Sequence, residues 1–137
     1  MGNILNLEGG GKIDIDNNGE LVTIGLYEKS TINGAHVAIP ENSTQLLLAA
    51  LDATTTTGGE GRAKIGEVRG VENGAGDIVT IVNTTQAFSR PVLKFSVATK
   101  NGELGTVQCS GPEIVALAAL LRVEAYKLSH KDEKPPF

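Results

Sequence analysis

The chain has 137 residues, of which 40% are hydrophobic and 20% charged, and its formal net charge is −4. This composition suits one globular domain with its own core and argues against wholesale disorder. A negative charge, taken alone, argues against a nucleic-acid partner, because Lys and Arg drive phosphate binding. The one cysteine, Cys109, excludes an intramolecular disulfide, and there is no signal-peptide pattern or apolar run of membrane length. We therefore expect a cytoplasmic protein.

The first half of the chain alternates strand and turn patterns before one helix. The clearest strand pattern is Leu21–Lys29, where apolar and polar residues alternate with period two. Asn-Gly pairs, which readily supply the positive φ of tight hairpins, separate the candidates. Ser43 is expected to cap a helix that runs through Leu51. The weaker strand candidates are Ile4–Glu8, Lys12–Asp16 and His36–Pro40.

The second half has the same order and ends in a longer helix. Strand patterns cover Ala63–Arg69, Asp77–Thr84, Val92–Lys100 and Leu104–Cys109. Ser110 is expected to cap the helix, whose apolar surface is wider than one face requires. Such a helix lies deep in the core or packs against another subunit. We expect a homo-oligomer, a dimer or a tetramer, held through Ile114, Leu117 and Leu121.

The two halves repeat one pattern. Val22–Lys29 matches Leu93–Lys100 in hydrophobic phase, and an Asn-Gly turn, a further strand, a serine cap and a helix follow in both halves. The offset is 71 residues for these strand segments, 68 for the Asn-Gly pairs and 67 for the serine caps. This predicts an α+β fold made of a duplicated ββββα unit, with antiparallel sheets packed against two helices. The expected domain is 1–130, with pseudo-repeats at about 1–57 and 62–129 and a flexible tail at 131–137.

One face of the predicted sheets carries cations and an aromatic ring. Strand alternation places Tyr27 and Lys29 on the face opposite the apolar core positions, and it does the same for Lys94 and Lys100. Between Arg62 and Lys100 there are six cations and three carboxylates, a local balance of +3. Such a face can bind single-stranded nucleic acid, because cations contact phosphates and aromatic rings stack on bases. The alternative is an ordinary polar sheet face, which would have the same composition. The candidate nucleic-acid-binding residues are Tyr27, Lys29, Arg62, Lys64, Arg69, Phe88, Arg90, Lys94 and Lys100.

The search for catalytic and metal-binding patterns is mostly negative. The two histidines, His36 and His130, have no Cys, Asp or Glu at metal-ligand spacing, and no glycine run has the context of a phosphate loop. A nucleophilic pair of Cys109 and His36 stays open, although Cys109 has the pattern of a buried residue. Asp14 and Asp16 share a strand face and are read as charge that protects an edge strand. We expect no enzyme, no cofactor and no metal.

Two copies of four strands and a helix resemble the whirly and Pur-alpha families of single-stranded nucleic-acid binders. The resemblance is one of layout and covers most of the chain. It implies sequence-independent binding of single-stranded DNA or RNA, in replication or recombination, by a protein that a phage or plasmid could encode. The alternatives are a structural or assembly protein of the virion type, without nucleic-acid binding, and a small enzyme that uses Cys109.

The last seven residues, KDEKPPF, resemble the acidic tip of bacterial single-strand-binding proteins, in which acidic residues precede a terminal Pro-Phe. This resemblance implies docking to replication or repair proteins. It assigns that role to Asp132, Glu133, Pro136 and Phe137, although Lys131 and Lys134 interrupt the acidic run. The other reading is a frayed tail.

Overall fold

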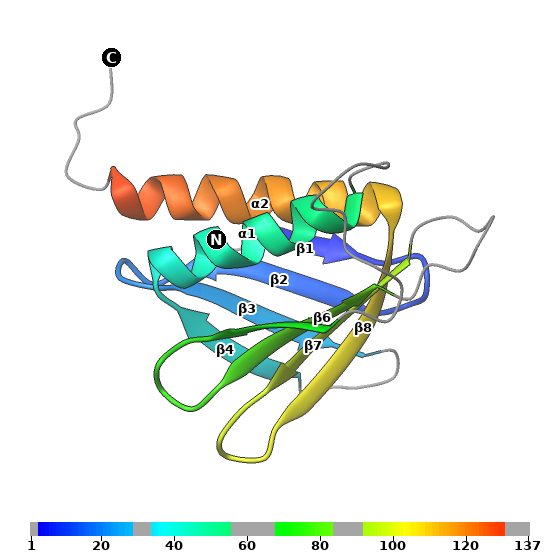
Figure 1. The fold of residues 1–137 in the computed structure, drawn as a ribbon, viewed down its shortest axis with the longest axis horizontal. Coiled ribbons are helices and arrows are strands. Elements are labelled where there is room, and N and C mark those ends of the chain that lie inside the picture. Colours follow the sequence, from blue (N-terminus) through cyan, green and yellow to red (C-terminus); the bar gives the residue numbers. More distant parts are fainter. Residues whose placement is uncertain (1–2, 29–33, 56–67, 84–91, 131–137) are drawn as a thin grey trace.

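The computed structural model describes residues 3–28, 34–55, 68–83 and 92–130 and has two antiparallel four-stranded sheets and two helices (Figure 1). This is the α+β fold of duplicated ββββα units that the sequence predicts. The elements are β1 (Asn3–Asn6), β2 (Lys12–Asn17), β3 (Val22–Tyr27), β4 (Ala35–Ile39), α1 (Glu41–Thr55), β5 (Val68–Glu72), β6 (Ile78–Asn83), β7 (Val92–Ala98), β8 (Leu104–Ser110) and α2 (Gly111–Ser129).

Sheet 1 consists of β1 to β4 in sequence order, each strand paired with the next. Its strands alternate as the sequence indicates, because neighbouring residues of a strand point to opposite faces. On the face that we call inner, Ile13, Ile24 and Leu26 are completely buried. Gly25 and its partner His36 lie in one row of the other face, which we call outer.

Sheet 2 repeats this arrangement with β5 to β8. Its inner face buries Ile81, Phe95 and Val97, and its outer face carries rows of polar residues such as Ser96 and Thr106. Gly102 has a φ of 89° in the tight turn before β8, which confirms the expected use of an Asn-Gly pair there.

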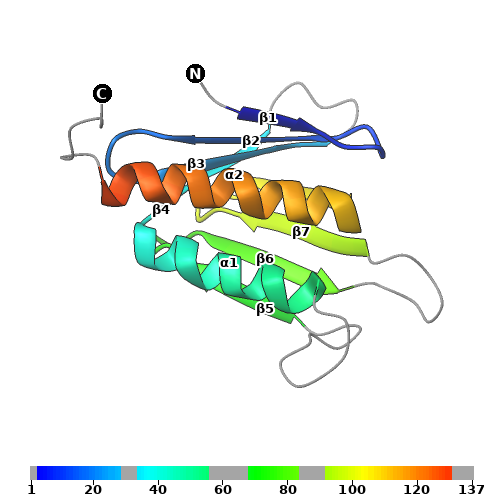
Figure 2. The same ribbon diagram turned by 90° about the horizontal axis from the view of Figure 1, so that it is seen from above.

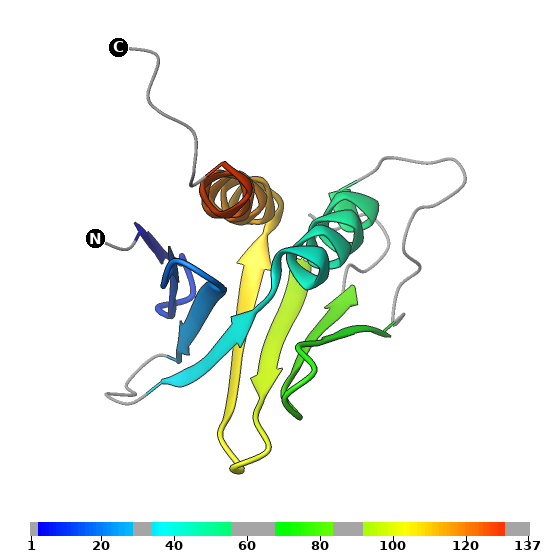
Figure 3. The same ribbon diagram turned by 90° about the vertical axis from the view of Figure 1, so that its left-hand side faces the viewer.

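Each helix packs on the sheet of the other repeat. α1 follows sheet 1 in the chain but packs on β5 and β6, whereas α2 follows sheet 2 and packs on β1, β2 and β3 and also contacts β7 and β8 of its own sheet (Figure 2). The two helices lie side by side and antiparallel on the same side of the strands, and Figure 3 shows both nearly end-on. An ion pair between Arg122 and Asp52, with Nη2 2.8 Å from Oδ1, joins the two helices.

The two sheets also touch directly through their inner faces, where β3 contacts β8 and β4 contacts β7. A Cβ atom on Gly105 would lie 3.0 Å from Cβ of Ala35 and 3.3 Å from Cβ of Leu26, so this glycine allows the close approach. Because the inner faces meet here, the outer faces of the two sheets point away from each other.

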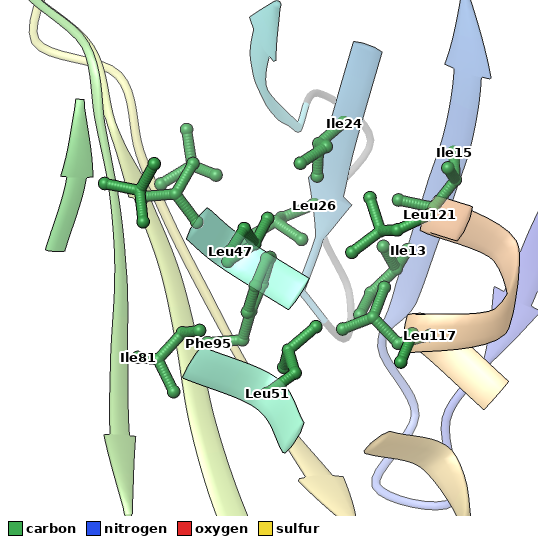
Figure 4. Close-up of a cluster of buried hydrophobic side chains, with 14 of the residues drawn as sticks. Ile13, Ile15, Ile24, Leu26, Leu47, Leu51, Ile81, Phe95, Leu117 and Leu121 are labelled. Atoms are coloured by element: carbon green, nitrogen blue, oxygen red, sulfur yellow. The ribbon is translucent and has the colours of Figure 1, made fainter. Parts of the chain in front are cut away.

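One hydrophobic core fills the space between the sheets and the helices (Figure 4). Ile114, Leu117 and Leu121 of α2 are all 0% exposed in this core. The prediction that these three residues make subunit contacts is therefore wrong, because the chain buries them against its own strands. The exposed apolar residues of the helices are others, namely Leu46, Val115, Val123 and Tyr126.

The two predicted serine caps have different outcomes. Ser110 is the N-cap of α2, and its backbone N–H donates to Oε1 of Glu113 at 2.9 Å, as in a capping box. Ser43 lies inside α1, which begins at Glu41, so it does not cap the helix. Its hydroxyl instead donates to the backbone carbonyl of Glu72 at 2.9 Å, which joins α1 to β5.

Candidate nucleic-acid interface

An aromatic pair stands on the outer face of sheet 1. The hydroxyl of Tyr27 on β3 lies 2.6 Å from Nε2 of His36 on β4, and the ring centroids are 5.3 Å apart at 80°. Gly25 makes room for both rings, since a Cβ atom there would lie 2.9 Å from Cδ2 of His36 and 3.2 Å from Cε2 of Tyr27. The Tyr27–His36 pair therefore leans over a position without a side chain and offers ring surface to the solvent.

Charged residues of β2 flank this pair. Lys12 is the cross-strand partner of Tyr27 and is exposed, and Asp14 is the partner of Gly25. Asp16 occupies the next outward position of the strand. Because β2 lies between β1 and β3, it is not an edge strand, and the interpretation of these two aspartates as edge protection is wrong.

The outer face of sheet 2 is mixed: one row contains Glu72, Ile78, Ala98 and Leu104, and the rows beside it contain polar residues and one cation. Lys94 is exposed in a row with Val82 and Gln108. In the neighbouring row the hydroxyls of Ser96 and Thr106 lie 3.0 Å apart. This face can meet a phosphate through Lys94, but its described strands carry no aromatic ring on that side.

The structure separates the predicted binding residues that it describes. Tyr27 lies on the outer face of sheet 1 and Lys94 on that of sheet 2, while Lys100 lies in the turn after β7. Arg69 pairs with the buried Ile81 and so belongs to the inner-face row of sheet 2. The expectation that one sheet face unites Tyr27, Lys94 and Lys100 is wrong, because the two outer faces point in different directions.

Other predicted residues lie outside the described part of the chain. From the nucleic-acid-binding set these are Lys29, Arg62, Lys64, Phe88 and Arg90. From the partner-binding set these are Asp132, Glu133, Pro136 and Phe137.

The proposed nucleophilic pair does not form. Cys109 is completely buried on the inner face of sheet 2, whereas His36 is exposed on the outer face of sheet 1. Burial, with a smaller contribution from the Glu113 carboxylate, raises the pKa of the Cys109 thiol to about 12, which disfavours the reactive thiolate. Among the described residues, no three His, Cys, Asp or Glu side chains group closely enough to hold a metal ion.

His36, Lys12 and Asp14 belong to this face and were missing from the predicted nucleic-acid-binding residues. The alternation of His36 with Val37 and Ile39 already puts it opposite the core side of β4. The missing information was the register, because only the pairing of Gly25 with His36 brings the imidazole to Tyr27.

Comparison with known proteins adds no further constraint on function. The sequence matches no known family model and no curated protein. Within the described ranges, no helix is long and apolar enough to cross a membrane.

Proposed function

We propose that this protein binds single-stranded nucleic acid without catalysing a reaction, and that the outer face of sheet 1 is the binding surface. The observation that supports this proposal is the half-buried Tyr27 ring beside the exposed His36 over Gly25 on an antiparallel sheet. Unpaired bases stack on aromatic rings, and this contact tolerates any sequence because every base has a π face. The layout shared with whirly and Pur-alpha proteins agrees with the proposal as an analogy of fold.

The charges around the pair determine where the phosphate backbone of the bound nucleic acid lies. Lys12, beside Tyr27, is the cation that meets a phosphate, whereas Asp14 and Asp16 repel phosphates from the neighbouring rows. We therefore place the bases against the sheet and the backbone toward the solvent side, near Lys12. With a net charge of −4, binding depends more on stacking than on counter-ion release.

The test measures the affinity for fluorescein-labelled oligo-dT by anisotropy over a salt series. Tyr27→Ala should weaken binding about fivefold or more, because stacking contributes about 1–3 kcal/mol per base. Tyr27→Phe keeps the ring and should bind nearly as the natural chain does. Equal affinity of the natural chain and Tyr27→Ala, with both correctly folded, would exclude this surface.

Two matched charge reversals identify the sheet that binds. Lys12→Glu changes the outer face of sheet 1 and Lys94→Glu that of sheet 2, and both lysines are exposed. The proposal requires that Lys12→Glu weaken binding and lower the salt dependence more than Lys94→Glu does. The reverse order would assign the nucleic acid to sheet 2.

A structural or assembly role is the second candidate, and the exposed apolar residues of the helix layer favour it. Leu46 and Val123 are 63% and 48% exposed. Tyr126 lines a depression of about 450 Å³ between the helices. If the protein binds no single-stranded oligomer of any base but forms large particles in light scattering, this second role explains the exposed surface better.

A further inference from the structure

The carboxylate of Asp14 lies on the outer face of sheet 1 in the same row as Gly25 and His36. The side chain is half-buried, and its Oδ1 atom is shielded from solvent without accepting a hydrogen bond from any described residue. Because Oδ1 has lost water without gaining a donor, the carboxylate is short of hydrogen-bond donors, and an incoming N–H that reaches its other oxygen, Oδ2, offsets part of this cost.

The position of Asp14 fits a contact with the edge of a stacked base. Tyr27 and His36 cover Gly25 from one side, and Asp14 flanks Gly25 on the neighbouring strand. Tyr27 is the diagonal neighbour of Asp14 across β2 and β3, and such residues lie about 7–8 Å apart, so a base that stacks on the Tyr27 ring can bring its edge to the carboxylate. Ile4, 61% exposed and opposite Asp14 on β1, supplies an apolar boundary on the far side.

An ionised carboxylate only accepts hydrogen bonds, so it discriminates between base edges. Cytosine and adenine present an exocyclic amino group, which donates to a carboxylate. Thymine presents a carbonyl oxygen at the position of the cytosine amino group, and two acceptors facing each other repel. The geometry thus favours bases with an amino group over thymine.

We propose that Asp14 makes this face selective for amino-bearing bases, with cytosine and adenine preferred over thymine. This inference rests on the proposed single-strand binding and adds a specificity to it. Stacking on one ring of the Tyr27–His36 pair holds the base, and Asp14 accepts a hydrogen bond from its amino group. The neighbouring Asp16 lies in the row of Thr23 and Ala38, beyond the Tyr27–His36 pair, and takes no part in the selection.

The experiment compares the affinity for oligo-dC, oligo-dA and oligo-dT of equal length, at neutral pH and fixed salt. Homopolymers make the register of the strand irrelevant. The natural chain should bind oligo-dC and oligo-dA about tenfold more tightly than oligo-dT, in keeping with the discrimination of one good base contact. In Asp14→Asn this preference should fall to about twofold or less, because an amide can also donate to the thymine oxygen.

Asp16→Asn is the matched control, because it removes the same charge from the same face of β2. It should raise the affinity for all three oligomers together and keep their ratio. The preference is refuted if the natural chain binds all three equally, or if Asp16→Asn removes it as well as Asp14→Asn does. Failure to bind any of the three would instead refute the proposed function, so the two outcomes are distinguishable.

Discussion

The carboxylate of Glu124 on α2 accepts a hydrogen bond from the side-chain amide of Asn17 at the end of β2, although the two residues belong to different repeats. Asn3 of β1 donates to the same carboxylate at 3.2 Å, and Lys127 pairs with it at 3.1 Å. Glu124 is completely buried. Its polar contacts therefore fix the position of α2 on the first two strands.

Glu124→Gln should lower the free energy of unfolding by about 1–3 kcal/mol. The NH2 group of the glutamine amide is itself a donor, so it cannot accept the hydrogen bonds that one carboxylate oxygen now accepts. Glu20→Gln is the control, because it makes the same change at an exposed residue and should alter the stability by less than about 0.5 kcal/mol. Urea unfolding followed by circular dichroism measures both. Equal stability of Glu124→Gln and the natural chain would show that these contacts do not hold the helix.

Asp77 should make stability depend on acid pH. Its carboxylate accepts from the backbone N–H of Lys100 at 3.1 Å and from the Asn73 amide at 2.8 Å, which lower its pKa below the ordinary value of 3.8. The folded state then binds fewer protons than the unfolded state. This contribution is present in full above 3.8 and is lost as the pH falls through the folded pKa. Urea unfolding at a series of pH values should show a steeper acid loss for the natural chain than for Asp77→Asn, and parallel curves would contradict it.

A matched pair of substitutions on α2 separates core from surface. Leu121→Glu places a charge in the closed core and should cost more than about 3 kcal/mol, enough to unfold most of the protein. Val123→Glu, two residues away and exposed, should change stability by less than about 1 kcal/mol. Thermal unfolding measures both. If the helix layer mediates self-association, Val123→Glu should also lower the mass in light scattering, whereas a stable and folded Leu121→Glu would contradict the core position.

Cys109 should be unreactive in the folded protein. Complete burial and the raised pKa keep the thiol protonated at pH values near 8, where exposed cysteines react with disulfide reagents. A thiol-specific chromogenic reagent should label the protein only after urea is added. Labelling of the native chain at the rate of a free thiol would contradict the placement of Cys109 on the inner face.

The sequence predicts the repeated elements well because their signals are local. Alternation identifies the inner residues of β3 and β7, such as Leu26 and Phe95, and Asn-Gly pairs identify the hairpins. The start of α1 is missed by three residues, since a Ser43 cap would start the helix at Thr44 whereas it starts at Glu41, and the Ser43 hydroxyl donates to Glu72 of β5. The choice between a cap and a distant acceptor depends on tertiary contacts, which are absent from a local pattern.

The candidate site was harder to predict because it depends on pairing between strands. Tyr27 was correctly assigned to the outward side of its strand, but its partner His36 follows from the β3–β4 register. Lys94 was also correctly assigned to an outward side, yet of a different sheet. The alternation of residues within one strand contains no information about how the outer faces of the two sheets are oriented relative to each other.

The exchange of helices between the repeats has a consequence for the origin of the fold. The first ββββα unit alone would leave its apolar sheet bare, because α1 packs on β5 and β6 and the helix that covers the inner face of β2 and β3 belongs to the second unit. Two such units close one core by exchanging helices about a twofold axis. The chain thus has the architecture of an obligate dimer joined into one polypeptide. Such fusion frees the two outer faces to diverge, and here one carries the Tyr27–His36 pair while the other carries Lys94 among hydroxyl groups.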